Sequence, residues 1–133
     1  MDTKGMREIL FRGKRIDNGE WVEGYFVNLW LVHYQKHQPI ITDNNAVSYD
    51  VDPSTVGQYT GLCDKNGKKI FEGDIMAFTA YGFDCVGTVE FADGSFSIMC
   101  EHTSPFLDQA VSKHGAYIIG NMHDNPELLK GAE

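Results

Sequence analysis

Cys100 and His102 are the two residues whose types and spacing could support nucleophilic chemistry. They lie two positions apart, with Asp108 further along the chain. Side chains two apart on a β-strand face the same side, so a Cys–His pair is sterically feasible, and His114 offers a second imidazole. Cys100 also closes an apolar segment, where a cysteine typically acts as a small buried hydrophobe. Because the sequence contains no G-x-S-x-G or H-E-x-x-H motif, we assign no catalytic residue.

His33 and His37 have the spacing of a metal-binding pair on a helix. Two imidazoles four residues apart share one helical face and could bind a metal ion together. The segment 32–37 has no helix signal, however, and no third ligand lies near it in sequence. We interpret both as surface-loop histidines and assign no metal or cofactor site.

The stretch 59–74 contains Gly61, Gly67 and Gly73, which resemble a glycine-rich phosphate loop. Phosphate loops need their glycines at a strand-to-helix junction, where backbone N–H groups converge on an anion. Strand-like segments flank these glycines, so turn chemistry is the better interpretation. Asp74 is then expected to accept hydrogen bonds from N–H groups of its turn. The same logic predicts turn and cap roles for Asn121, Asp124 and Asn125.

The elements that must position these residues are mainly strands. Two Asn-Gly pairs, 18–19 and 66–67, each predict a type I′ hairpin turn. Segment 21–34 is rich in aromatic and β-branched residues, and we expect Trp21, Tyr25 and Val27 to face the core. Val89, Phe91, Phe96 and Ile98 share one face of a hairpin whose loop is predicted to span 92–94. The remaining expected strands are 7–12, 39–42, 46–49, 58–62, 68–71, 75–79 and 116–119.

Helix signals are few and short. Ser104 and Pro105 could begin a helix that runs to about Val111, with serine as N-cap. Asn125 and Pro126 predict a closing helical turn over 126–130. The spacing of the two Asn-Gly pairs and their neighbouring glycines is nearly the same, which fits either an internal repeat or two hairpins that merely look alike.

Composition limits the class of protein. The chain has 133 residues, which fits one domain, and a formal net charge of −8. That charge argues against a general nucleic-acid binder, which needs a basic face. Three cysteines without a C-x-x-C motif indicate free thiols in a reducing cytoplasm. No apolar run is long enough to cross a membrane, and residues 1–6 lack the apolar segment of a signal peptide, so we expect a cytoplasmic protein.

Several motifs together resemble the YopX family of bacteriophage and prophage proteins. They are Met6–Arg12, Gly57–Leu62, Asp64–Gly67, Phe71–Ile75, Gly87–Phe91 and Ile119–Leu129, in that order. Cys63 departs from the polar or basic residue that such sequences more often carry. The resemblance implies a β-rich fold with an SH3-like barrel in the C-terminal half and a mobile-element origin in a bacterial host. It implies no catalytic residues.

These observations predict a mainly β protein, with a small barrel-like or SH3-like architecture of hairpins and a short C-terminal helical turn. We expect a polar lead over residues 1–5 and a single domain over 6–133. An internal division into 6–55 and 56–133 is the alternative.

The predicted function is a non-enzymatic phage or prophage accessory protein that binds protein or assembles with itself. Trp30 and Tyr34 could form an exposed patch for a partner or another copy, although core packing is the simpler explanation for them. Nucleic-acid binding by a small β-barrel is a second hypothesis. Its basic residues would be Lys65, Lys68 and Lys69 with Arg7, Arg12, Lys14 and Arg15. An enzyme whose site combines Cys100 with His102 or His114 is the third.

Overall fold

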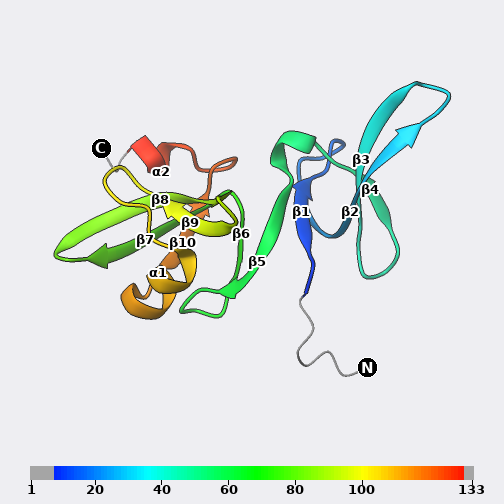
Figure 1. Cartoon of the computed structure of the whole chain (residues 1–133). Coiled ribbons are helices and arrows are strands. Elements are labelled where there is room, and N and C mark those ends of the chain that lie inside the picture. The colour runs from blue at the N-terminus through cyan, green and yellow to red at the C-terminus, as the bar shows by residue number, and fades with distance from the viewer. Residues whose placement is uncertain (1–7, 131–133) are drawn as a thin grey trace. The chain divides into compact units, whose positions relative to one another are not determined.

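Aromatic and β-branched segments separated by Gly, Asn and Asp form short strands throughout the chain. The computed structural model describes residues 8–130, and within them it contains ten strands, two α-helices and one 3₁₀ turn (Figure 1). The mainly β class is therefore confirmed. The predicted polar lead, and the part of the first expected strand that includes Arg7, lie outside the described residues.

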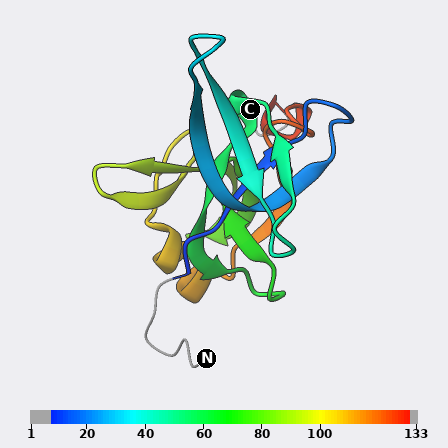
Figure 2. The same cartoon turned by 90° about the vertical axis from the view of Figure 1, so that its right-hand side faces the viewer.

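The chain divides into two compact units, Met1–Tyr59 and Thr60–Glu133. In the first unit, β2 pairs antiparallel with both β1 and β3, and β4 pairs with β3. Figures 1 and 2 show β2 and β3 as a long hairpin. The elements of this unit are β1 (Phe11–Lys14), β2 (Trp21–Leu31), β3 (Lys36–Thr42), β4 (Ser48–Asp50) and η1 (Pro53–Thr55).

Strand β5 (Gly57–Cys63) continues from the first unit into the second. Its first two residues pair with Arg12 and Phe11 of β1. The second unit is a four-stranded antiparallel sheet in the order β10-β7-β8-β9, with helix α1 packed against it. Its elements are β6 (Lys69–Phe71), β7 (Asp74–Ala80), β8 (Phe83–Ala92), β9 (Ser95–Met99), α1 (Leu107–His114), β10 (Tyr117–Asn121) and α2 (Glu127–Lys130).

The sheets of the described residues do not close into a barrel, which corrects the barrel-like part of our prediction, whereas the SH3-like likeness stays a prediction. In the second unit, the outer edges of strands β9 and β10 each make a contact with another segment of the chain. The edge of β9 forms a bridge between Ser97 and Phe106. The edge of β10 donates the N–H of Ile118 to the Asp64 carboxylate over 3.0 Å. Because both edges are partly satisfied locally, closure is not needed to protect them.

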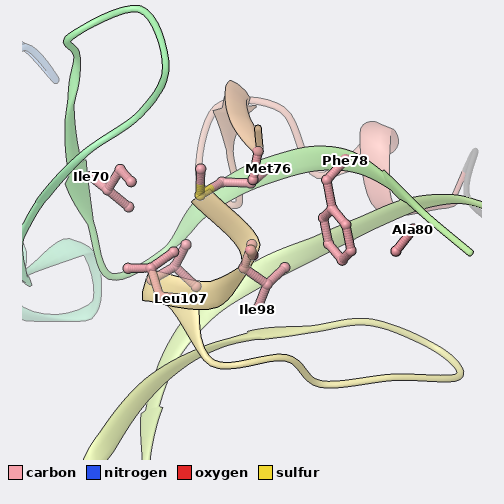
Figure 3. Close-up of a cluster of buried hydrophobic side chains, with 9 residues drawn as sticks. Ile70, Met76, Phe78, Ala80, Ile98 and Leu107 are labelled. Carbon is pink, nitrogen blue, oxygen red and sulfur yellow. The ribbon is translucent and has the colours of Figure 1, made fainter. Parts of the chain in front are cut away.

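The second unit contains a continuous hydrophobic core between its sheet and α1 (Figure 3). Met76, Phe78 and Ala80 alternate along β7 and contribute one side of this core. Ile98 of β9 and Leu107 of α1 are fully buried against them. Val89 and Ile98 therefore face the core as predicted, whereas Phe91 at the hairpin end is exposed and packs edge-on against Phe96.

The buried face of β2 is opposite to the one we predicted. Tyr25 and Val27 are 68% and 51% exposed, whereas Phe26 is half-buried. Phe26 pairs with Ile41, which is completely buried, so the Phe26 face contains the core. Trp21 shares the Tyr25 face and packs against side chains of β1. The apolar content of both faces of β2 explains why periodicity alone chose the wrong one.

The two Asn-Gly turns also differ from prediction. A type I′ turn needs positive φ at both central residues, but only the glycines, Gly19 and Gly67, have it. In the first turn the N–H of Gly19 donates to the carbonyl of Arg15. In the second, the N–H of Gly67 donates to the carbonyl of Asp64, one residue closer. The two turns therefore close differently, which offers no support for an internal repeat.

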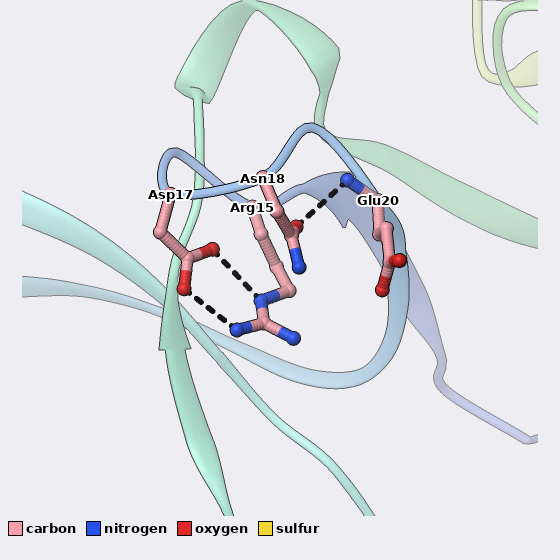
Figure 4. Close-up of polar contacts among 4 residues, drawn as sticks. All are labelled: Arg15, Asp17, Asn18 and Glu20. Carbon is pink, nitrogen blue, oxygen red and sulfur yellow. Dashed lines mark hydrogen bonds and ion pairs between the residues drawn. The ribbon is translucent and has the colours of Figure 1, made fainter.

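Side chains explain the first turn (Figure 4). The Asn18 side-chain oxygen accepts the N–H of Glu20 at 2.9 Å. Arg15 donates through two nitrogens to the two oxygens of Asp17, at 2.9 and 2.6 Å. This hydrogen bonding and charge pairing lower the pKa of Asp17 and raise that of Arg15. The loop is held by these polar contacts and not by I′ backbone geometry.

Type I′ geometry occurs instead where aromatic or acidic residues precede glycine. Tyr81 and Gly82 both have positive φ between the paired residues Ala80 and Phe83. Asp93 and Gly94 likewise both have positive φ, between the paired residues Ala92 and Ser95, so this loop has two residues and not the three we predicted.

Helix α1 begins at Leu107 after Phe106, later than the predicted Ser104–Pro105 start, because residues 103–106 hydrogen-bond to the edge of β9. Helix α2 matches the predicted closing turn within one residue.

Candidate functional site

The glycine-rich stretch is built around a buried carboxylate and not around a ligand cradle. Asp64 is 6% exposed, and its Oδ1 accepts the N–H groups of Asn66 and Lys68 at 2.9 Å each. Its Oδ2 accepts the N–H of Ile118. Burial alone would raise the pKa of Asp64, but these hydrogen bonds lower it. Asp64 thus joins the β5–β6 turn to β10, a structural role.

The other polar turn residues behave as the sequence predicted. Asp74 is 2% exposed and accepts the N–H of Phe71 at 2.8 Å. The side-chain oxygen of Asn121 accepts the N–H groups of His123 and Asp124, at 3.0 and 2.9 Å. Asn125 accepts the N–H of Asn121 through its side-chain oxygen at 3.3 Å. These contacts are turn and cap chemistry, which accounts for much of the motif-rich sequence.

Cys100 does not have the properties of a nucleophile. Burial, with a smaller contribution from the neighbouring Cys85, raises the pKa of the Cys100 thiol to about 11. Its Sγ lies 3.8 Å from the carbonyl of Ile98. His102 is strongly exposed, and its imidazole lies 3.9 Å from Glu101. A thiol that stays protonated at neutral pH cannot attack an electrophile efficiently, so this arrangement disfavours the enzyme hypothesis.

His33 and His37 lie on a turn and on strand β3, so they do not share the helical face that a metal pair would need. The ring of His37 instead packs edge-on against Trp30, with centroids 4.9 Å apart. Within residues 8–130, no group of three or more His, Cys, Asp or Glu side chains is arranged to hold a metal ion.

Several of the basic residues considered for nucleic-acid binding pack on aromatic rings of their own unit. The guanidinium of Arg12 and the ammonium of Lys14 lie 4.7 and 5.5 Å from the centroid of the Trp21 ring. In the second unit, the Lys65 ammonium lies 4.4 Å from the Tyr117 ring. Cation–π packing of this kind gives these charges a structural role and makes fewer of them available for phosphates.

An apolar surface covers one side of the β2–β3 hairpin. We call it the hairpin face and define it as Tyr25, Val27 and Leu29 of β2 with their cross-strand partners Thr42, Ile40 and Gln38 of β3. Tyr25, Val27 and Leu29 are 68%, 51% and 42% exposed. Trp30 and Tyr34, the patch expected from the sequence, are also exposed, but Trp30 points to the opposite side of the hairpin.

A cavity of about 630 Å³ lies in the second unit, between the tip of the β7–β8 hairpin, the segment 100–106 and α1. We call it the α1 cavity. Cys100, His102 and His114, the residues of the enzyme hypothesis, all line it, together with Cys85. Asp108 does not line this cavity and instead accepts the N–H of Gln109.

Sequence reasoning missed three aromatic residues at the α1 cavity, Tyr81, Phe83 and Phe106. Tyr81 and Phe83 flank Gly82 in a segment that reads as a loop, whereas Phe106 follows Pro105 in the segment expected to begin a helix. The one available signal was the presence of bulky rings beside Gly or Pro, where polar residues are the rule.

The fold and its surfaces define a small two-unit β protein with exposed apolar side chains on the hairpin face and around the α1 cavity. The family model described as YopX protein matches residues 10–130, and the chain therefore belongs to the YopX family. It is similar to protein EF1440 from Enterococcus faecalis, known from a crystal structure. The identity is 27% and the TM-score 0.57, over 92% of this chain and 98% of that one. Comparison with curated proteins gives no match.

None of the helices in the described part of the chain is long and apolar enough to span a membrane.

Proposed function

We propose that this YopX protein is a non-enzymatic module that binds protein, and that its first partner is a second copy of its own chain. The observation that carries this proposal is the hairpin face. Three large side chains that follow one another on a single side of β2 are at least two-fifths exposed. Contiguous apolar surface of this kind is typical of protein interaction sites.

The charge of the hairpin face favours a protein partner. Its six residues form three cross-strand pairs and carry no charge, although the whole chain carries −8. Interface centres are depleted in charged residues and enriched in aromatic ones. The neutral face therefore suits the centre of an interface better than contact with phosphates or acidic substrates.

A second copy is the partner that fits this face best. Two identical apolar faces are complementary by symmetry, and isologous pairs are the commonest soluble assemblies. Elsewhere, like net charges would make two copies repel each other. The six residues of the hairpin face carry no charge, which lowers that repulsion at the centre of the contact, and Asp50, the cross-strand neighbour of Ile40, lies at the edge of the face.

A pair of adjacent substitutions tests the proposal. Val27→Asp places a charge on the hairpin face, whereas Asn28→Asp adds the same charge at the next, also exposed, position on the other side of β2. By light scattering, we expect the wild type and N28D to have about twice the mass of the 14.9 kDa chain, and V27D to be monomeric. Circular dichroism verifies that all three are folded.

A wild type that remains monomeric would contradict self-association. A pull-down from host extract then tests the broader proposal. Capture of a protein by wild type and N28D but not by V27D would retain the hairpin face as a binding surface. A monomer that captures nothing would refute both.

We also propose that the protein originates from a phage or prophage and acts in the bacterial cytoplasm. Membership of the YopX family supports the origin. Three free cysteines support a reducing compartment. Phage genes beside the coding sequence, and recovery of the protein from the soluble cell fraction, are the expected results. An isolated chromosomal gene or an exported protein would contradict them.

A further inference from the structure

The α1 cavity has the size and lining of a site for a small molecule. Its volume of about 630 Å³ falls within the range of ligand pockets. It lies wholly within the second unit and is independent of the hairpin face. Phe78 and Ala80, which extend from the core along β7 (Figure 3), form part of its wall, so a rigid core supports it.

Aromatic rings surround this cavity. The Phe78 ring stacks on the His114 ring, with centroids 5.9 Å apart and planes inclined by 25°. Tyr81 meets the same imidazole edge-on at 5.8 Å. At the rim, Tyr81, Phe83 and Phe106 are 90%, 73% and 60% exposed. Rings that remain in water around an apolar hollow would gain by burying their faces against a flat ligand.

The polar groups of the cavity favour a ligand that both donates and accepts hydrogen bonds. Gln109 offers an amide from α1, and Lys113 offers an ammonium one helical turn further on. Across the cavity, Asp84 and Glu101 offer carboxylates. Cations and anions are thus both present, which does not fit a site selective for anions. Cys85 and Cys100 add thiol surface that is polarisable.

We propose that the α1 cavity binds a small planar heteroaromatic molecule of one or two rings. The rings stack against the aromatic lining, and the edge of the molecule hydrogen-bonds to Gln109. This combination of apolar walls with a few convergent polar groups is what fixes a ligand's orientation in small-molecule sites. The site needs no covalent step and no metal ion.

Titration of the ¹⁵N-labelled chain with adenine, uracil and quinoxaline, followed by NMR, tests the proposal. Toluene and cyclohexanol serve as ring-only and saturated controls. We expect amide shifts at the cavity lining, and affinity for at least one heteroaromatic probe about tenfold or more above both controls. Absence of shifts at the lining, or equal affinity for cyclohexanol, would overturn the proposal.

Two residues of β8 provide a matched pair of variants. Phe83→Ala removes a ring from the rim, whereas Phe91→Ala removes a similarly exposed ring that does not line the cavity. F83A should weaken binding by roughly tenfold, the effect of losing one stacked ring, and F91A should leave it unchanged. Equal losses in both variants would overturn the proposal.

A third variant separates hydrogen bonding from stacking and does not depend on the behaviour of F83A. Gln109→Leu keeps the size of an exposed helix residue but removes its amide. Q109L should lose the preference for the heteroaromatic probe over toluene. If Q109L keeps that preference, the assignment to heteroaromatic ligands is wrong. It is also wrong if the amides of the cavity lining shift only when a protein captured in the pull-down is added.

Discussion

At the scale of single residues, the turn at residues 64–68 is explained by one carboxylate. Asp64 accepts three backbone N–H groups while buried, and Ile118 is 54 residues away along the chain. A carboxylate has enough acceptor sites for three donors, whereas a neutral amide has only one acceptor oxygen. The acidic residue is therefore needed for the fold, and no ligand is required to explain it.

Asp64→Asn should destabilise the protein by about 1–3 kcal/mol, because the new NH₂ group faces at least one buried N–H donor. Chemical denaturation of the second unit measures this loss. Asp93→Asn, at an exposed hairpin tip, is the control and should have little effect. An unchanged free energy of unfolding in D64N would contradict the structural role of Asp64.

The same carboxylate predicts a pH dependence. Because the pKa of Asp64 is lowered in the folded state, its contribution is complete above the unfolded pKa of about 3.9 and is lost as pH falls through the folded value. The difference in stability between wild type and D64N should therefore shrink below about pH 4. A constant difference between neutral and strongly acidic pH would contradict this assignment.

Cys100 should resist alkylation. With a pKa of about 11, its thiol is almost fully protonated at pH 8, whereas Cys63 is exposed. Mass spectrometry after brief treatment with iodoacetamide should find Cys63 modified and Cys100 more than about a hundredfold slower. Comparable rates at the two cysteines would revive the nucleophile hypothesis.

At the scale of elements, strand content and the hydrogen-bonding roles of several polar turn residues could be predicted from the sequence, but the types of the hairpin turns and the buried face of β2 could not. Asn121, Asp74 and the closing helix have local signals that do not depend on the tertiary fold. Tyr25 and Phe26, by contrast, are both aromatic, so hydrophobicity does not distinguish the core face from the exposed face. The α1 cavity was also beyond prediction, because it joins residues from three separate segments, 78–86, 100–106 and 109–114.

Gly24 controls the geometry of β2. A Cβ atom at this position would lie 2.0 Å from the carbonyl oxygen of Thr42. The Thr42 backbone cannot move away as a flexible side chain would. Gly24→Ala should therefore lower the free energy of unfolding by about 1–3 kcal/mol or more. Asn28→Ala on the same strand should change stability by less than about 0.5 kcal/mol. Equal stability of the two variants in urea would show that β2 and β3 pair differently.

At the scale of the whole molecule, the two units should unfold separately. Both tryptophans, Trp21 and Trp30, belong to the first unit, so fluorescence reports on that unit alone. Far-ultraviolet circular dichroism reports on both. We expect the urea transitions measured by the two probes not to coincide. The G24A substitution should shift the midpoint of the fluorescence transition more than the midpoint of the circular dichroism transition. Coincident transitions would contradict independent units and favour the single domain over 6–133.

Net charge is the second property of the whole chain. The chain has a formal net charge of −8, and several of its cations pack on aromatic rings. In filter binding at low salt, the protein should therefore retain neither DNA nor RNA on the filter. Retention that decreases steeply with added salt would support the nucleic-acid hypothesis instead.

The central claim, that two copies meet through the hairpin face, is tested most directly by NMR on a mixture of ¹³C-labelled and unlabelled chains. We expect intermolecular contacts from the methyl groups of Val27 and Leu29 in the labelled chain to protons of its unlabelled partner. The absence of intermolecular contacts, or contacts confined to another surface, would contradict the account.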